Sequence, residues 1–270
     1  MQIAEQAAAF KAAYAASGEP FGYETSCKLV PGCALTERFL ISIHKDAFVS
    51  LGLKELLPAE VLKNVPADLW SWYDAGLPAA DVVHFGFESS AKPVLKLYLE
   101  STSAFYTGLK YDSRNRIMVY DALKWGAELT PVNSQYVCRP EQSEEVLEQT
   151  IVGCFPVDQK EASQLAKGYL QQALKILPAK QLLMLEVEEQ GSIRQSFDLN
   201  LYDLEQTVMQ WADLIRDTWQ LQQLDSQSLE MFLQTHGDKV LGHVSAGTGR
   251  DGQVFFTLYF GATEQVPEAT

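Results

Sequence analysis

The feature that most constrains the fold is a strand–turn–strand pattern that recurs along the chain. In each copy, residues of alternating polarity flank a short segment rich in Gly, Pro or Ser, which is the pattern of a β-hairpin. Two copies match closely, since His84 occupies the position of His243, and Leu97-Tyr98 occupies that of Leu258-Tyr259. The predicted strands are Tyr23–Leu29 with Glu37–His44, Val82–Glu88 with Val94–Glu100, Leu182–Glu188 with Arg194–Tyr202, and Leu241–Gly247 with Val254–Phe260.

The spacing of these hairpins indicates a repeat architecture. They begin near residues 22, 82, 182 and 241, so the intervals are 60, 100 and 59 residues. Self-similarity at a fixed period is typical of repeated structural units. The long interval leaves room for a fifth hairpin, and its strands are expected at Ile117–Tyr120 and Ser134–Cys138.

Helices are predicted between the hairpins. The 3.6-residue period favours helices over residues 157–177 and 204–221, and a third helix begins at Asp225 and ends at Gly237. Helical pieces broken at Pro58 and Pro66 are expected over residues 51–77.

An antiparallel sheet covered by helices on one side must hide its other face, and closure into a barrel does this. We therefore predict one domain, residues 1–270, of the α+β class. It is a ten-stranded antiparallel β-barrel of repeated αββα units with a solvent-filled lumen surrounded by helices.

Polar residues on alternate strand positions are predicted to face the lumen. In the strand from Arg194 to Tyr202, the polar residues share one face, and Phe197, Leu199 and Leu201 share the other. The alternative is a half-exposed sheet whose polar face meets bulk water. The other residues predicted to face the lumen include Glu24, Ser26, Lys28, Arg38, Ser42, His44, His84, Glu88, Lys96, Tyr98, Glu100, His243, Ser245, Phe255, Thr257 and Tyr259.

Composition excludes several classes of partner. The chain carries 21 Lys and Arg against 35 Asp and Glu, and its formal net charge is −14, so we expect no nucleic-acid partner and no anionic membrane partner. No apolar stretch is long enough for a transmembrane helix, and no signal peptide is recognised. The four cysteines lack CxxC spacing, which favours reduced thiols in a cytoplasmic protein over a zinc site.

Two hairpins carry a resemblance to a known family. Helix–hairpin–helix units around a ten-stranded barrel resemble the plan of the ABBA aromatic prenyltransferases. Glu24–Lys28, followed by Arg38-Phe39-Leu40, resembles the first hairpin of the cyanobactin-type peptide prenyltransferases, and Val94–Tyr98 resembles a strand of their second hairpin. The segment 101–115 departs from the pattern, because it is too short for the usual pair of helices.

The resemblance implies an enzyme that ionises an allylic diphosphate, so cationic side chains must hold the departing oxygens. Lys28, Arg38, Lys96 and Arg194 lie on different predicted strands, and Arg139 is a weaker candidate. The ordinary alternative for each of these residues is a solvated charge.

Such an enzyme also needs aromatic faces that shield the cation and a base that takes the proton lost by the acceptor. Tyr98, Tyr202 and Tyr259 recur in three second strands, with Phe255 nearby. Each of them is otherwise a packing residue. Glu24 is the predicted base, although with Lys28 it also fits a surface ion pair.

His243 is predicted to assist acid–base chemistry. A metal site shared by His84 and His243 lacks a third ligand, so no metal-binding residue is predicted. Mg²⁺ is implied by the resemblance only, and the chain lacks an Asp-Asp-x-x-Asp cluster.

Small residues suggest room for a longer donor chain. Gly242, Ser245, Ala246 and Gly247 would leave space for a ten-carbon geranyl group rather than a five-carbon dimethylallyl group.

The resulting hypothesis is a prenyltransferase. It moves a dimethylallyl or geranyl group from its diphosphate to an aromatic or nucleophilic side chain of a peptide, or to an indole. The alternative is a non-catalytic β-barrel that binds or chaperones a hydrophobic small molecule or chromophore. Only the enzyme requires four buried cations.

Overall fold

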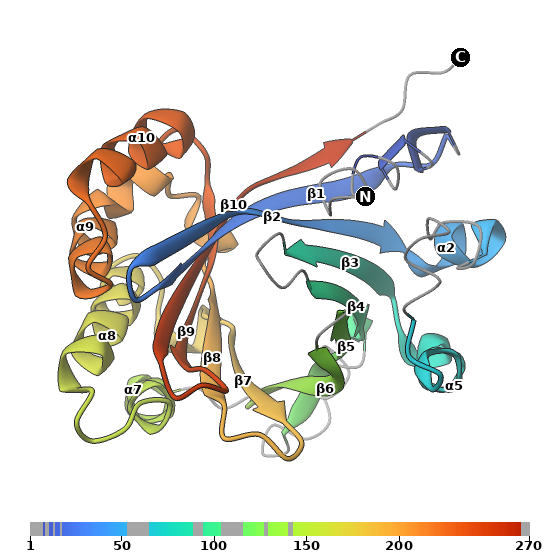
Figure 1. Cartoon of the computed structure of the whole chain (residues 1–270), viewed down its shortest axis with the longest axis horizontal. Coiled ribbons are helices and arrows are strands. Elements are labelled where there is room, and N and C mark those ends of the chain that lie inside the picture. Colours follow the sequence, from blue (N-terminus) through green and yellow to red (C-terminus); the bar gives the residue numbers. More distant parts are fainter. Residues whose placement is uncertain are drawn as a thin grey trace.

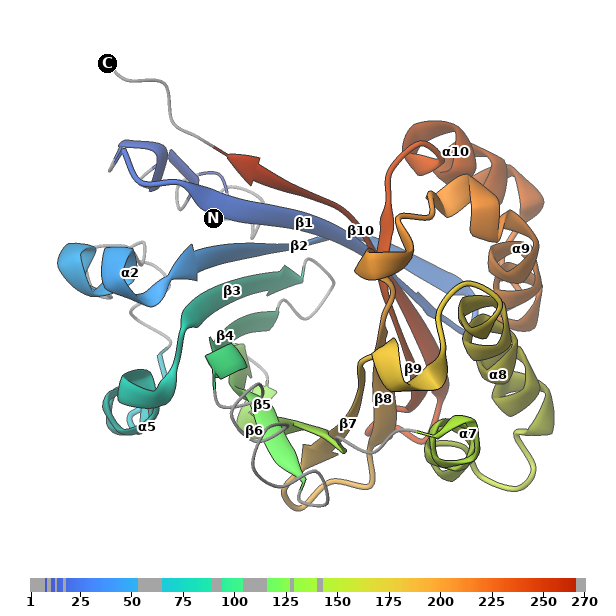
Figure 2. The ribbon, with the colours of Figure 1, turned by 180° about the vertical axis from the view of Figure 1, so that it is seen from behind.

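A closed antiparallel barrel organises the chain. The computed structural model describes residues 8, 11–12, 14–16, 18–52, 65–88, 94–103, 116–126, 129–139 and 143–265. Within them, the strands close into one barrel in the order β1-β10-β9-β8-β7-β6-β5-β4-β3-β2 (Figure 1, Figure 2). Neighbouring strands are thus consecutive in sequence, except that the first strand, β1, pairs with the last strand, β10. The predicted fold class is confirmed.

Five hairpins supply the strands, as the repeat predicts. The two strands of each hairpin pair directly with each other, and β1 and β10 pair to close the barrel. The strand bounds are β1 Phe21–Val30, β2 Cys33–His44, β3 Val82–Glu88, β4 Val94–Glu100, β5 Ile117–Gly126, β6 Leu129–Cys138, β7 Met184–Glu189, β8 Gln195–Asn200, β9 Leu241–Thr248 and β10 Val254–Gln265.

Two hairpins differ in detail from the prediction. The middle strands are longer than expected, since β5 continues to Gly126 and β6 starts at Leu129. In the next hairpin, β8 ends at Asn200 and Tyr202 begins a short 3-10 turn, Tyr202–Leu204. The second turn, residues 89–93, lies outside the described residues.

The predicted helices form with shifted ends. Asp225 caps the last helix, because its carboxylate accepts a hydrogen bond from the Ser228 amide. Gly237 ends this helix, but with φ −60° it does not use the left-handed conformation of a glycine C-cap. Residues 53–64 lie outside the described residues. The helices are α2 Lys45–Leu51, α5 Leu69–Gly76, α7 Glu144–Gly153, α8 Lys160–Leu174, α9 Ala212–Leu221 and α10 Ser226–His236, and 3-10 turns occur at Leu77–Ala79, Ala179–Gln181 and Val208–Trp211.

Two apolar layers cover the outside of the barrel. Helices α7 to α10 gather on one side in Figure 1, and their apolar stripes pack on outward residues of β8, β9 and β10 such as Phe197, Val244 and Leu258. Helices α2 and α5 lie on the opposite side, against outward residues of β2 to β4 such as Ile41 and Leu97. The alternation predicted from the sequence therefore places apolar residues outward.

A charged outer surface separates these layers. Around β6 and β7, Arg116 pairs with Glu186 and Glu188, and Arg139 pairs with Glu186 at 2.6 Å. These partners extend outward, because Glu186 lies opposite the outward residues Val137 and Phe197 in the two strand pairings. Arg116 comes directly after residues 101–115, the segment that is too short for the usual pair of helices.

No helix among the described residues has both the length and the apolar character needed to cross a membrane. The four cysteines, Cys27, Cys33, Cys138 and Cys154, are all free thiols.

The outward packing makes a stability prediction. Leu258 is fully buried under the α7–α10 helices, so Leu258→Ala should lower the free energy of unfolding by about 2–5 kcal/mol because it leaves a cavity. The measurement is urea unfolding followed by circular dichroism. Val157→Ala is the control, since Val157 is 84% exposed and should change stability by less than about 0.5 kcal/mol. Equal midpoints for the two variants would contradict the packing described.

Candidate functional site

The barrel lumen is divided along its axis into two chemical zones. The hairpin turns lie at one end of the barrel, and the connections that contain helices lie at the other, as the strand order requires. Basic side chains occupy inward positions toward the turns, whereas a cavity of about 710 Å³ opens toward the helical connections. Tyrosines separate the two zones.

Glu88 organises the first half of the basic zone. Its carboxylate pairs with the Arg38 guanidinium at 2.7 Å and with the Lys96 ammonium at 2.9 Å. Lys28 completes this group, and its ammonium lies 4.9 Å from the centroid of the Phe255 ring. The structure thus brings together three of the predicted cations with the predicted aromatic ring.

Glu189 organises the second half. Its carboxylate pairs with Lys124 at 3.0 Å, Arg194 at 2.8 Å and Arg250 at 2.7 Å. Arg194 also lies over Phe255, with its guanidinium carbon 5.2 Å from the ring centroid. It belongs to the β7–β8 turn rather than to the strand, yet it reaches the predicted lumen position.

The basic zone holds more cations than carboxylates, and its pKa values reflect this. Burial together with the neighbouring cations lowers the pKa of Lys28 and of Lys96 to about 8, although Glu88 opposes the shift. Burial would raise the pKa of Glu88, but Arg38, Lys96 and Lys28 hold it well below its usual range. An anion placed among these groups would raise the pKa of both lysines and so favour their charged forms.

Aromatic rings lie between the basic zone and the cavity. Tyr136 lies beside Tyr98 and Tyr120, with ring centroids 5.9 Å and 5.7 Å apart. These rings and Tyr259 line the cavity, and burial raises the pKa of each hydroxyl, so all four phenols stay protonated. They present a surface of aromatic faces and neutral hydroxyls to a ligand.

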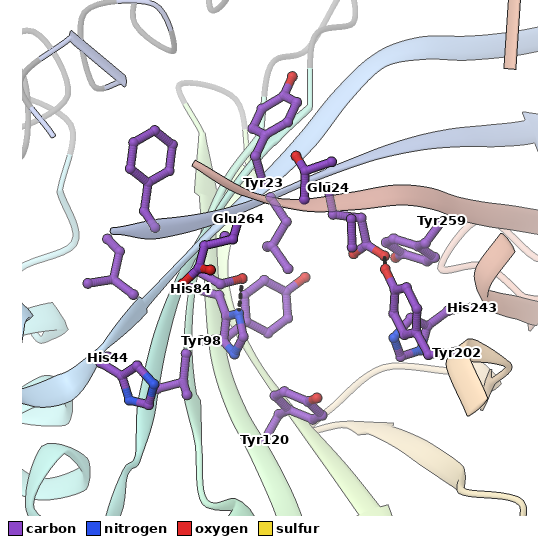
Figure 3. Close-up of a pocket in the computed structure, with 18 of the residues that line it drawn as sticks. Tyr23, Glu24, His44, His84, Tyr98, Tyr120, Tyr202, His243, Tyr259 and Glu264 are labelled. Carbon is purple, nitrogen blue, oxygen red and sulfur yellow. Dashed lines mark hydrogen bonds between the residues drawn. The ribbon is translucent and has the colours of Figure 1, made fainter. Parts of the chain in front are cut away.

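Glu24 lies on one wall of this cavity (Figure 3). Its carboxylate accepts a hydrogen bond from the Tyr202 hydroxyl, and burial raises the pKa of Glu24 although His243 opposes the shift. The His243 ring bonds Asp198 at 2.7 Å. Burial would lower the pKa of His243, but Asp198 and Glu24 raise it to about 9, so the ring is cationic at neutral pH.

The facing wall carries a second imidazole, as the matching positions in the sequence suggest. His84 bonds the Ser42 hydroxyl through Nδ1 and the Glu100 carboxylate through Nε2, both at 2.7 Å. Glu100 also accepts a hydrogen bond from Thr102. Both ring nitrogens of His84 are therefore already engaged.

The small residues of β9 do not leave the space that the sequence suggests for a longer donor chain. A Cβ atom at Gly242 would lie 2.1 Å from Tyr202 Cζ, and one at Gly247 would lie 2.1 Å from the Gln195 carbonyl oxygen. Ser245 is buried and donates to the Phe197 carbonyl. The Tyr202 ring occupies the space beside Gly242, and strand β8 occupies the space beside Gly247. These glycines therefore allow close packing and do not enlarge the lumen.

Other differences concern which residues reach the lumen. Arg139 lies on the outer charged surface, where it pairs with Glu186 and its side chain is 51% exposed, so it does not belong to the predicted group of lumen cations. Lys124, Tyr120 and Tyr136 belong to the lumen but were not predicted. The signal for them was the alternation within the middle hairpin, which places Tyr120 and Lys124 on the same face of β5 as Ala122.

A scan against known protein families finds no match, and a search of curated proteins finds none either. Among solved structures, the prenyltransferase PriB in complex with product diphosphate superimposes with a TM-score of 0.62 at 15% identity, covering 88% of this chain and 79% of PriB. The chain has the prenyltransferase barrel fold.

Two further prenyltransferase barrels have similar scores. The 5-dimethylallyltryptophan synthase from Streptomyces coelicolor matches with a TM-score of 0.61 at 14% identity, covering 88% of this chain and 80% of the synthase. The 6-dimethylallyltryptophan synthase from Micromonospora olivasterospora, in complex with DMASPP and Trp, matches with a TM-score of 0.58 at 13% identity, covering 88% and 81%. These matches show the barrel, and the finer resemblance to cyanobactin-type peptide enzymes stays a prediction.

The contact between Gly242 and Tyr202 gives a second stability prediction. Gly242→Ala should destabilise the protein by about 1–3 kcal/mol, because the added Cβ must displace a ring whose hydroxyl bonds Glu24. Urea unfolding measures the loss. Gly153→Ala is the matched control, since a Cβ at Gly153 would have no neighbour within 4 Å. An unchanged unfolding midpoint for Gly242→Ala would mean that Tyr202 does not pack there.

Proposed function

We propose that the protein is a prenyltransferase that moves an allylic isoprenyl group from its diphosphate to an aromatic acceptor. The observation that carries this proposal is the order of groups along the lumen. A cluster with excess cations comes first, then a layer of tyrosines, then a cavity with a buried carboxylate. That order matches the order of diphosphate, allylic cation and acceptor in such a transfer.

In this proposal the basic zone binds the diphosphate. Lys28, Arg38, Lys96 and Arg194 are the proposed ligands, and Lys124 joins them because it shares Glu189 with Arg194. Negative charge grows on the departing oxygen as the allylic C–O bond breaks and its electron pair leaves with the diphosphate. Fixed cations in a buried site stabilise that charge more strongly than water does.

The tyrosines are proposed to shield the allylic cation. Tyr98, Tyr202 and Tyr259 were predicted for this role, and Tyr120 and Tyr136 line the same cavity. The faces of neutral phenol rings attract a cation through their quadrupole and keep water away from it. Phe255, between Lys28 and Arg194, lies deeper in the lumen, on the diphosphate side.

Glu24 is proposed as the base. When the acceptor ring attacks the allylic carbon, a C–C bond forms and the ring must then lose a proton. A carboxylate whose pKa is raised by burial is a stronger proton acceptor than an exposed one. His243, held by Asp198, is proposed to offset the negative charge of the Glu24 carboxylate before that carboxylate takes the proton and becomes neutral.

The acceptor is proposed to be an indole or another aromatic group, on a free molecule or on a peptide. PriB has been seen in a ternary complex with L-tryptophan and dimethylallyl thiolodiphosphate, which supports an aromatic acceptor and an allylic diphosphate donor for this fold. The peptide acceptor rests on the resemblance of the first two hairpins alone. A dimethylallyl donor is favoured, because the space invoked for geranyl is filled by Tyr202.

The lumen donors do not fit a resident Mg²⁺. Glu88 and Glu189 each bind two or more cationic side chains, so their oxygens are committed. Among the described residues, no group of three or more His, Cys, Asp or Glu side chains is placed to hold a metal ion. The Mg²⁺ implied by the resemblance stays a prediction.

The alternative, a carrier of a neutral hydrophobic molecule, also fits an aromatic cavity. A neutral ligand would not pair with the cations of the basic zone, and burying several cations is costly unless an anion compensates their charge. The transfer proposal uses both zones, so we favour it.

A direct assay tests the transfer. The protein is incubated with dimethylallyl diphosphate and a panel of indoles, phenols and aromatic peptides, and mass spectrometry detects the gain of one prenyl unit. Glu24→Gln should lower kcat by about 10²–10⁴-fold with little change in donor affinity, because it removes the base.

Glu230→Gln is the control for this substitution, since Glu230 is exposed on α10 and away from the lumen. Full activity of Glu24→Gln would refute the assignment of the base. The absence of any prenylated product across the panel would refute the proposed function.

The lysine pKa values give a pH prediction for donor binding. Lys28 and Lys96 are cationic below about pH 8 and lose their protons above it. The affinity for dimethylallyl thiolodiphosphate should therefore be level near pH 7 and fall above pH 8, by about tenfold per pH unit for each lysine that must be charged. Calorimetric titration from neutral to alkaline pH measures this.

Lys96→Gln should weaken binding at pH 7 and make the decline above pH 8 less steep, because one of the two titrating cations is gone. Unchanged donor affinity in Lys96→Gln would refute the role of the basic zone.

A further inference from the structure

The cavity of about 710 Å³, in which the acceptor is proposed to bind, is called the acceptor cavity. Its walls carry carboxyl groups rather than basic side chains. Glu24 and Asp198 lie within it, and Glu19 and Glu264 lie toward its opening. No Lys or Arg occurs among the described residues that line it. The cavity is thus acidic, although it lies in the same lumen as the basic zone.

The imidazoles in the cavity do not offset this. His243 is cationic but already pairs with Asp198, and its charge also supports Glu24. His84 is held at both nitrogens by Ser42 and Glu100, so it has no N–H left for an incoming anion. His44 lines the exposed edge of the cavity.

Charge is therefore separated along the lumen, with basic side chains on one side of the tyrosines and carboxyl groups on the other. The cations cluster around Glu88 and Glu189 toward the hairpin turns, where the proposed diphosphate binds. Carboxyl groups and tyrosine faces remain on the acceptor side, and Figure 3 labels Glu24, Glu264, Tyr98, Tyr120 and Tyr259 among the residues that line this cavity. Tyrosine faces and carboxylates both attract an ammonium ion.

We propose that the acceptor is an aromatic compound that carries an ammonium group and no free carboxylate, such as an arylalkylamine or an aromatic residue near the amino end of a peptide. This inference rests on the proposed function and names the class of acceptor. A free amino acid would bring a carboxylate into a cavity that already holds several and whose described lining residues include no Lys or Arg. Burying an unpaired charge beside like charges opposes binding.

This preference would distinguish the chain from PriB, whose ternary complex contains L-tryptophan. The barrel is shared, but the charge at the acceptor end belongs to side chains that the fold does not dictate. Charge complementarity is a common source of specificity between partners of the same shape.

The test compares four compounds that share one aromatic ring and differ in three charge patterns. Tryptamine and L-tryptophan amide carry the ammonium alone, L-tryptophan carries both charges, and N-acetyl-L-tryptophan carries the carboxylate alone. Tyramine, tyrosine amide, tyrosine and N-acetyltyrosine repeat the series for a phenol. Binding is measured by calorimetry with dimethylallyl thiolodiphosphate bound, and transfer is measured with dimethylallyl diphosphate.

We expect kcat/KM and affinity to be highest for the two ammonium compounds, lower by about tenfold or more for the free amino acid, and lowest for the N-acetyl acid. Equal or better use of the free amino acid, with transfer observed, would overturn this inference while the proposed function stands. The expected order in binding without any transfer would instead refute the proposed function.

A variant separates charge from shape. Glu264→Gln keeps the size of a side chain near the cavity opening and should reduce the preference for tryptamine over tryptophan several-fold. Glu230→Gln removes the same charge from an exposed helix outside the cavity and should leave the preference unchanged. Equal effects of the two variants would mean that overall charge, rather than the cavity, sets the preference, and would overturn the inference.

Discussion

The pairing of β1 with β10 is the interaction on which the rest of the structure depends. It joins Phe21 to Gln265 at one end of the ladder and Leu29 to Phe256 at the other, and it turns a ten-stranded sheet into a barrel. Without it, the polar face of every strand would meet bulk water, and the lysine and glutamate side chains inside would be ordinary solvated ions. Closure makes the lumen a medium in which charges interact strongly.

That enclosure governs the chemistry proposed for the site. Glu88 and Glu189 hold the basic side chains in place but do not neutralise all of them, and burial, together with the neighbouring cations, lowers the pKa of Lys28 and Lys96. The same burial raises the pKa of Glu24. Burial of charged groups therefore favours a bound anion at the basic end of the lumen and makes the Glu24 carboxylate at the other end a better proton acceptor.

Sequence patterns predicted much of this arrangement, because a strand with one buried face must alternate. The alternation placed Lys28, Arg38, Lys96, Tyr98 and Tyr259 on the lumen face, where the structure has them. It failed where the local pattern was incomplete. Arg139 follows the last residue of β6 and turns outward to Glu186, and Gly242 is small because a tyrosine ring from another turn fills its place. Neither contact is visible from neighbouring residues.

The sequence by itself determined the repeated hairpins, the inward and outward face of each strand, and hence the barrel, because alternation and turn residues act over a few positions. Only the tertiary structure decided which charges meet. The pairs Arg38–Glu88 and Arg194–Glu189, the Tyr202–Glu24 hydrogen bond and the acidic acceptor cavity depend on distances that closure of the barrel sets. Electrostatic energy depends on those distances and on burial, and neither is a property of a segment of sequence.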